Sequence, residues 1–347
     1  EIYTLSLHDA LPISSLVYQA ARQILPAIAY GDAAGLPVEG KSAEYIRERY
    51  GRIAELQAPS YHPFFPGSAR GTVSDDTQLS LAVARSLLKN NGFSLESLAD
   101  EHIAAYRQAP RTAEGVPCGW GGSTVKAVER MISGVSPRES GEKDKAGNGV
   151  VMKMAPLVVW QVLSEVDGRT RRGQYDLLTN MTHNSEIARI CTRLHGEVLS
   201  ALLEGRTVSE SADRFIQTLA VNNFSKESEL IHRAIYSPCQ TDEELAERYA
   251  AGKSGTDYGF YAPETLAIAY DIFLGAGGDM QAAVYRAVNL GGDSDSTASI
   301  VAAMIACQSG GAYKEPPDME SVQGIEQLRT VSTQLAEAAL RRTVKLG

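Results

Sequence analysis

Two short clusters of acidic and hydroxyl side chains are the part of this sequence best suited to chemistry. One reads Gly291-Gly292-Asp293-Ser294-Asp295-Ser296-Thr297 near the C-terminal end, and the other reads Ser74-Asp75-Asp76-Thr77 far earlier in the chain. Each stands where a glycine-rich or polar turn runs into an apolar helical stretch. Like charges packed together raise one another's pKa or recruit a cation. If the two clusters meet in space, their oxygens form a site suited to Mg²⁺ or Mn²⁺.

The alternatives for these clusters fit less well. A lone Asp-x-Asp before a helix is usually an N-cap. An EF-hand loop that began at Asp293 would place Ala298 at the turn glycine and Met304 at the bidentate glutamate, which excludes that motif. A zinc site needs His or Cys ligands, and the histidines form no spaced pair with these aspartates. A hard-cation site remains, and the four aspartates with Glu39 could hold two ions about 3.5–4 Å apart.

The elements that must position these clusters are helices. Apolar residues recur at helical spacing through most of the chain, and convincing alternating strands are almost absent. We therefore predict an all-α fold of about a dozen helices, with functional loops at their ends. The predicted helical segments are 77–89, 95–107, 123–133, 153–165, 184–204, 208–220, 227–236, 242–251, 263–274, 280–289, 296–307 and 320–342.

Composition excludes several classes of protein. The 347 residues are 44% hydrophobic and 22% charged, as in ordinary globular proteins, and no linker divides the chain. The net charge of -9 argues against a nucleic-acid-binding surface. No apolar run reaches the roughly 20 residues that cross a membrane. The four cysteines match no metal or redox spacing, so we expect free thiols in a reducing compartment, the cytoplasm.

The first 14 residues, EIYTLSLHDALPIS, differ in character from the rest of the chain. They lack the basic start and long apolar core of a signal peptide, and they resemble translated sequencing-adapter read-through. We therefore expect residues 1–14 to be a non-native leader. The remaining residues, 15–347, are expected to form one compact domain.

Six motifs in collinear order carry a resemblance to a known family. They are GDAAGLPVEG, SDDTQLSLAVA, GNGVVMKMAPL, MTHNSEIA, YAPETLAIA and GGDSDSTASIVAAMIA. From about Ala20 to about Gly311, the chain resembles the ADP-ribosylglycohydrolase family, which includes the dinitrogenase-reductase-activating glycohydrolases. The resemblance implies an all-α protein with two Mg²⁺ or Mn²⁺ ions in a central cleft. It also implies hydrolysis of the glycosidic bond that joins ADP-ribose to a modified side chain.

The resemblance also assigns roles to individual residues. Glu39 matches a glutamate that ligates or gates the metal site in some members, and it is our first candidate for the catalytic base, with Asp295 as the second. Asp32, in the same motif as Glu39, is expected to cap or brace the loop. The residues implied as metal ligands are Ser74, Asp75, Asp76, Asp293, Asp295 and Ser296.

A second group of residues is implied to contact the substrate. Gly147-Asn148-Gly149 resembles a loop that approaches ribose and diphosphate, and the Trp120-Gly121-Gly122-Ser123 loop resembles one that lines the cleft. Trp120 could flank the ligand or serve packing, and both alternatives stay open. His183 should border the ligand. Tyr261 matches an aromatic residue used for adenine stacking, with Phe260 and Tyr258 as competing choices.

The implied substrate is an ADP-ribosylated protein or a small ADP-ribose conjugate, whose acceptor could be arginine, serine or another group. Two other classes remain open. One is a catalytically silent relative, such as an ADP-ribose-binding or crystallin-like protein, in which lost metal ligands would be expected. The other is a di-metal phosphohydrolase that cleaves a nucleotide at its diphosphate. All four aspartates are present, which argues against the silent relative. The metal clusters alone would permit the phosphohydrolase, but the collinear motifs do not favour it.

Overall fold

The structure is a computed structural model that describes residues 12–249, 259–308 and 310–346. Of the leader expected at residues 1–14, residues 1–11 lie outside these ranges. Residues 12–14 form the start of the first helix. Within the described ranges the chain is helical, with only two-residue strands, so the all-α prediction is confirmed. Among the described helices, none is both long and apolar enough to cross a membrane.

The helices follow one another along the whole chain. The α-helices are α1 (Pro12–Gly35), α2 (Ala43–Tyr50), α3 (Asp75–Asn90), α4 (Leu95–Gln108), α5 (Gly122–Ile132), α6 (Ala155–Leu163), α7 (Gly168–Thr182), α8 (Glu186–Leu203), α9 (Val208–Val221), α10 (Ser225–Tyr236), α11 (Asp242–Tyr249), α12 (Ala262–Gly275), α13 (Met280–Leu290), α14 (Ser294–Gln308) and α15 (Ile325–Leu346). The short 3-10 helices are η2 (Leu36–Val38), η3 (Val151–Lys153) and η4 (Met319–Ser321).

Four two-residue strands fasten loops near the ends of helices. They are β1 (Lys41–Ser42), β2 (Glu142–Lys143), β3 (His183–Asn184) and β4 (Gly291–Gly292). Strand β1 pairs antiparallel with β4, and β2 pairs parallel with β3. The first pair joins the segment after η2 to the turn that precedes α14. It therefore holds an early loop of the chain beside the late acidic cluster.

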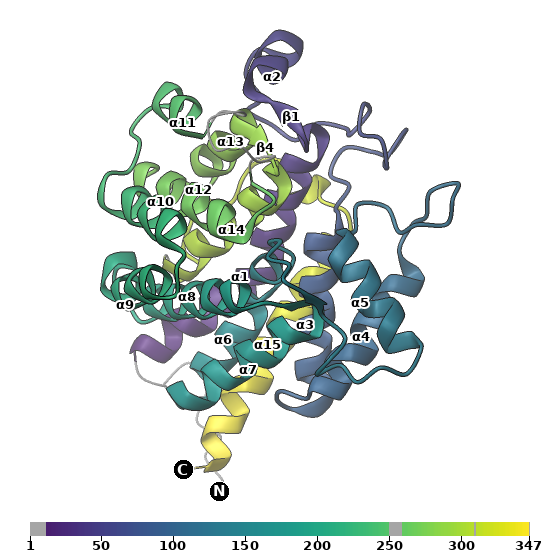
Figure 1. Ribbon diagram of the computed structural model, residues 1–347, viewed down its shortest axis with the longest axis vertical. Coiled ribbons are helices and arrows are strands. Elements are labelled where there is room, and N and C mark those ends of the chain that lie inside the picture. The colour runs from purple at the N-terminus through teal and green to yellow at the C-terminus, as the bar shows by residue number, and fades with distance from the viewer. Residues whose placement is uncertain (1–11, 250–258, 309, 347) are drawn as a thin grey trace, which may run out of the picture.

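Helix α1 lies in the centre of the molecule, packed against α3, α6, α14 and α15 (Figure 1). Helices α3, α4 and α5 lie together on one side, and α9, α10 and α11 lie on the opposite side (Figure 1). One cluster of buried apolar side chains reaches from Val17 in α1 to Ala339 in α15. Because α1 is buried over nearly its whole length, it forms the support on which the site-bearing helices rest.

Helices α1 and α14 approach each other closely through small residues. A Cβ added at Gly31 would collide with the main chain at Ala298, and one added at Gly35 would collide with the main chain at Asp295. Main-chain atoms cannot rotate away from such a collision as a flexible side chain can. The two glycines therefore fix the position of α14 relative to α1, and with it the position of the second acidic cluster.

Gly31→Ala should lower the free energy of unfolding by about 2–3 kcal/mol, because overpacking at a rigid contact forces the helices apart. Gly173→Ala is a matched control: Gly173 also lies inside a helix, but an added Cβ there meets nothing within 4 Å. The control should be neutral or stabilising by up to about 1 kcal/mol. Urea unfolding measures both, and equal stability of the two variants would contradict the close contact.

Candidate functional site

The first turns of α3 and α14 bring the two acidic clusters together around one cavity of about 310 Å³. Three loops complete its wall: the segment after α1, the turn before α5 and the turn before η3. The lining residues include Glu39, Phe64, Asp75, Asp76, Gly119, Trp120, Gly121, Gly122, Ser123, Gly147, Asn148, Gly149, Met152, His183, Phe260, Asp293, Asp295 and Ser296. Segments from both ends of the sequence thus form a single site.

The first acidic cluster is held at the start of α3 by Ser74 and Asp32. Ser74 is the N-cap residue, and its hydroxyl accepts a hydrogen bond from the Asp76 amide at 3.3 Å. Asp32, on α1, accepts hydrogen bonds from the Ser74 amide at 2.9 Å and from the Thr77 amide at 3.1 Å. The Thr77 hydroxyl also donates to Asp32, at 2.5 Å. Asp32 therefore braces the turn and does not line the cavity.

Asp32→Ala should lower the free energy of unfolding by about 2–4 kcal/mol, because several buried donors at the start of α3 would lose their acceptor. Asp279→Ala is the matched control, since Asp279 is an exposed aspartate that caps α13 through a single amide. The free energy of unfolding of the control should fall by about 1 kcal/mol. Urea unfolding compares the two, and equal losses would contradict the bracing role of Asp32.

The second acidic cluster is held by contacts with the α1 end and with the loop before η3. The Ser294 hydroxyl donates to the Gly35 carbonyl at 2.9 Å. The Asn148 side-chain amide donates to Asp293 at 2.6 Å and to the Gly259 carbonyl at 3.0 Å. Ser296 joins the clusters, because its hydroxyl donates to Asp76 Oδ2 at 3.2 Å. Asn148 thus orients a carboxylate, a role that its sequence motif alone did not show.

Glu39 approaches the cavity from the end of η2 and is held by a histidine. Its Oε2 lies 2.7 Å from Nε2 of His62, whose Nδ1 accepts a hydrogen bond from the Phe64 amide at 3.2 Å. A neutral imidazole that accepts at Nδ1 carries its proton on Nε2. His62 therefore donates to Glu39. Sequence reasoning missed His62, since no motif marks the loop from which it reaches the site.

Burial and mutual repulsion raise the pKa of the clustered aspartates. Burial is the largest cause, and it raises the pKa of Asp293 to about 7 and the pKa values of Asp75, Asp76 and Asp295 well above the ordinary range. The Glu39 charge acts in the same direction on Asp75, Asp293 and Asp295. Without a cation, the cluster therefore binds protons near neutral pH.

The oxygens of this cluster fit a hard divalent cation. One carboxylate oxygen each from Glu39, Asp293 and Asp295 lies within 4.8 Å of the others. Oδ1 of Asp76 and Oδ1 of Asp295 are buried, and within the described ranges of the chain neither has a hydrogen-bond partner. Buried oxygens that lack a donor are suited to cation binding. Of the six ligands that the resemblance implies, Asp75, Asp76, Asp293, Asp295 and Ser296 line the cavity.

The wall opposite the carboxylates begins with Trp120 and the start of α5. Trp120 is 6% exposed, and its indole donates to Gln78 at 3.0 Å and packs edge-on against Tyr106. It therefore lines the cavity as a fixed wall. Gly121 and Gly122 have open space where a Cβ would lie, and the N-terminus of α5 has no side-chain cap. Free main-chain amides at a helix start favour an anionic group such as a diphosphate.

The Gly147-Asn148-Gly149 loop lies against His183. A Cβ added at Gly147 or Gly149 would lie 3.3 or 3.1 Å from the imidazole ring, so both glycines allow the loop to pack on His183. Burial is the main reason that the pKa of His183 falls to about 3, and the nearby ammonium of Lys153 lowers it further. His183 is therefore neutral at physiological pH and borders the cavity as a hydrogen-bonding group.

Ser74 and Tyr261 are the predicted site residues that do not line this cavity. The Ser74 hydroxyl serves the cap of α3 and lies 3.4 Å from Asp76 Oδ2. Tyr261 lines a neighbouring groove of about 530 Å³ with Ile187, Phe224 and Phe260, and its hydroxyl donates to Glu227 at 3.0 Å. Phe260 lines both the groove and the cavity. Tyr258, the other aromatic alternative, lies outside the described residues.

Lys153 is a buried cation near the carboxylates that sequence reasoning did not single out. It is fully buried in η3, and among the described residues its ammonium has no hydrogen-bond partner. Burial lowers the pKa of Lys153 to about 7, although the Asp75 charge opposes this effect. The residue directly follows Met152, which lines the cavity. A partial positive charge therefore lies behind the first acidic cluster.

Comparisons with known proteins agree with this geometry. The family model described as ADP-ribosylglycohydrolase matches residues 14–345. The chain belongs to this family. It is 26% identical to an uncharacterized protein of Archaeoglobus fulgidus, covering 92% of this chain and 97% of that protein. It is 22% identical to the ADP-ribosylarginine hydrolase Tri1 of Pseudomonas putida, covering 92% of this chain and 78% of that protein.

A solved structure shows the same fold. The structure described as an ADP-ribosylglycohydrolase-related protein complex superposes with a TM-score of 0.68 at 21% identity, covering 94% of this chain and 99% of that chain. Membership of the ADP-ribosylglycohydrolase family supports a hydrolase that acts on ADP-ribose conjugates. The resemblance drawn from the six sequence motifs is confirmed.

Proposed function

We propose that this ADP-ribosylglycohydrolase uses two divalent cations, Mg²⁺ or Mn²⁺, to hydrolyse the bond between ADP-ribose and a modified acceptor. The observation that supports the proposal is the meeting of four buried aspartates with Glu39 at one cavity, with unpartnered oxygens on Asp76 and Asp295. A catalytically silent protein would have no reason to keep such a costly arrangement.

The residues proposed to hold the cations are Asp75, Asp76, Asp293, Asp295 and Ser296, and Ser74 would join them if its hydroxyl turned from the helix cap. When bound, divalent cations neutralise these carboxylates and polarise the substrate's ribose hydroxyls and the attacking water. Asn148 keeps Asp293 oriented through its 2.6 Å hydrogen bond, and Ser296 keeps Asp76 oriented.

Glu39 is proposed as the group that takes the proton of the attacking water. Its side chain is 20% exposed, while Asp295 is almost fully buried and remains the second candidate. His62 holds the Glu39 carboxylate at 2.7 Å. The water oxygen forms the new bond to the anomeric carbon, and the bond to the acceptor breaks. The acceptor leaves with the electron pair of that bond and takes up a proton.

The two glycine loops are proposed to orient the rest of ADP-ribose. The free amides at the start of α5 and the Gly147-Asn148-Gly149 loop would lie along the ribose and diphosphate, with neutral His183 beside them. Trp120 would form the wall. The adenine would extend toward the groove of Phe260 and Tyr261.

Arginine is the acceptor proposed for the first test, because one similar protein is an ADP-ribosylarginine hydrolase. The acceptor group would belong to a protein or to a small conjugate. A cytoplasmic location is also proposed, and it is supported by the four cysteines, which are buried free thiols.

The proposal is tested by incubating arginine- and serine-ADP-ribosylated peptides with the protein in Mg²⁺, Mn²⁺ or EDTA. We expect free ADP-ribose in the presence of either cation and none in EDTA. AMP and ribose phosphate as products would instead indicate cleavage of the diphosphate. Tight ADP-ribose binding with no product from either peptide would favour a binding protein.

A further inference from the structure

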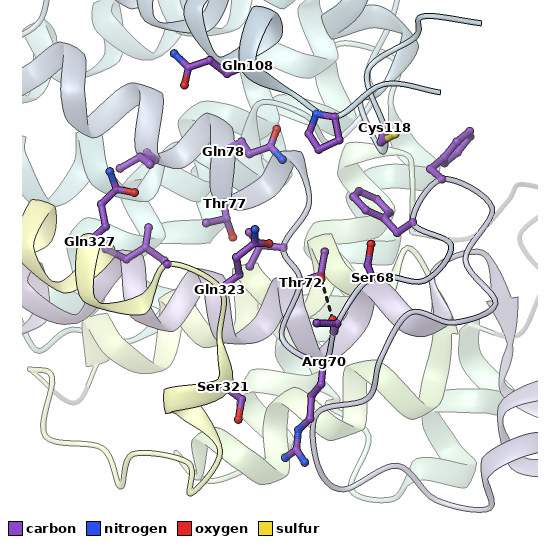
Figure 2. Close-up of a pocket in the computed structure, with 18 of the residues that line it drawn as sticks. Ser68, Arg70, Thr72, Thr77, Gln78, Gln108, Cys118, Ser321, Gln323 and Gln327 are labelled. Atoms are coloured by element: carbon purple, nitrogen blue, oxygen red, sulfur yellow. Dashed lines mark hydrogen bonds between the residues drawn. The ribbon is translucent and has the colours of Figure 1, made fainter. Parts of the chain in front are cut away.

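A large cavity lies beside the carboxylate site and has no role in the reaction proposed above. Its volume is about 1010 Å³, and it lies between the loop of residues 64–73, α3 and the start of α15. Figure 2 shows Gln78, Gln108, Gln323 and Gln327 around it, with Thr77 among them and Thr72 and Ser68 to their right. We name this cavity the glutamine groove after those four glutamines.

The glutamine groove adjoins the carboxylate cavity. Phe64, which is 47% exposed, lines both of them. Thr77 and Gln78 line the groove directly after Asp75 and Asp76 along α3. The same Gln78 accepts the hydrogen bond from Trp120, which forms a wall of the carboxylate cavity. An extended molecule held at the carboxylates could therefore reach the groove past Phe64.

The side chains that line the glutamine groove suit a bound polypeptide. Gln108, Gln323 and Gln327 are exposed, and each amide offers both a donor and an acceptor for the main chain of a bound segment. The volume is at the upper limit for pockets that bind one small molecule, about 1,000 Å³. The carboxylate cavity, in contrast, has only about 310 Å³, which leaves no room for residues that flank a modified side chain.

The charge of the groove also restricts its occupant. Of the described residues that line it, Arg70 and Arg111 are charged and none is acidic, although the chain as a whole carries a net charge of -9. Arg70 points away from the glutamines in Figure 2 and pairs with Asp318 at 2.9 Å. Arg111 donates to the carbonyls of Gly115 and Tyr106, so no carboxylate offsets its charge there. Segments with neutral or acidic residues therefore fit better than basic ones.

We infer that the glutamine groove binds the polypeptide that flanks the ADP-ribosylated side chain of a protein substrate. The inference rests on the proposed function, which places the adenine end of ADP-ribose toward Phe260 and Tyr261. The acceptor would then emerge beside Phe64, which lines both the carboxylate cavity and the groove. The groove thus selects protein acceptors by the residues around the modification, while the carboxylate cavity cleaves the bond.

The test compares two substrates with the same ADP-ribosyl-arginine bond. One is a labelled peptide with glutamate, serine and glycine around the modified arginine, and the other is ADP-ribose joined to free arginine. Gln327→Trp should raise KM for the peptide about tenfold and leave kcat/KM for the small conjugate unchanged. The matched control is Gln217→Trp, at an exposed glutamine on α9. It should change neither substrate.

Equal effects of Gln327→Trp on the two substrates, or no effect on the peptide, would overturn the inference. Glutamate flanks should give a lower KM than lysine flanks, and the reverse order would also overturn it. If the wild-type protein cleaves neither substrate, arginine is not the acceptor. The groove is then judged by fluorescence anisotropy of the labelled peptide: binding that Gln327→Trp alone removes supports the inference, and no binding to the wild type overturns it.

Discussion

Asp295→Asn should lower the rate of ADP-ribose release about 100-fold or more, since it removes one anionic ligand from the proposed cation site. The same substitution should raise the thermal stability of the cation-free protein. Asp295 is buried near Glu39, Asp293 and Asp76, and its pKa is raised first by burial and then by these charges. Replacing it with a neutral isostere relieves that repulsion. Hydrolysis assays and thermal unfolding in EDTA measure the two effects.

A variant that loses activity but gains thermal stability has lost the cation site and kept its fold. A damaged fold would lower both activity and stability. Asp100→Asn is the matched control, because Asp100 is an exposed aspartate on α4, far from the acidic clusters in the sequence. We expect it to keep full activity and unchanged stability. An Asp295→Asn protein that unfolds at lower temperature in EDTA, or that keeps most of its activity, would contradict the arrangement described here.

Removing divalent cations should destabilise the protein much more at pH 8 than at pH 5. The pKa of Asp293 is raised to about 7 and that of Asp32 to about 6, mainly by burial, so the folded state binds protons that the unfolded state has released. Stability without cations therefore falls as pH rises from about 4 to above 7. Bound cations replace the protons of the cavity aspartates but not that of Asp32, so they should make the midpoint of unfolding fall much less across this range.

We expect Mg²⁺ to raise the unfolding temperature by about 5 °C or more at pH 8 and by little at pH 5. Differential scanning calorimetry with Mg²⁺ or EDTA at both pH values measures this difference. The Asp295→Asn variant should show a smaller difference between pH 8 and pH 5 in the effect of Mg²⁺. A cation-free protein that is equally stable at pH 5 and pH 8 would show that the carboxylates do not repel one another as their burial requires.

The helices predicted from the sequence include amphipathic ones, such as α5 and α8, and uniformly buried ones, such as α12 and α14. The predicted segments correspond to α3–α6 and α8–α15, with ends that differ by a few residues. Helix α1 was not predicted, because Pro26 interrupts its apolar stripe and Gly31 and Gly35 near its end are residues that favour turns. Helix α7, with Arg169, Arg171 and Arg172 in its first turns, is too polar to show a clear stripe. Tertiary packing, which the pattern of residues along the sequence does not show, determines that both α1 and α7 are helical.

Within the site, the sequence located residues that belong to motifs and missed those that reach it from ordinary loops. The acidic clusters, Asn148 and His183 lie around the cavity where the motif order suggested. His62, which holds Glu39, comes from a loop without any such signal. Phe64 likewise contacts the site only because its loop folds over the start of α3. Their roles depend on how loops pack, which spacing along the chain does not determine.

The contact of α1 with α14 also has a consequence for how the protein is made. Asp75 and Asp76 leave the ribosome long before Asp293 and Asp295, and the close approach of Gly31 and Gly35 to α14 joins helices from opposite ends of the chain. Contacts so distant in sequence form slowly, because a long loop must close before they stabilise anything. During synthesis, the first acidic cluster cannot meet the second until the last fifth of the chain has been made. A nascent or truncated chain therefore lacks the paired acidic clusters, and the activity proposed for them appears only once the whole fold is assembled.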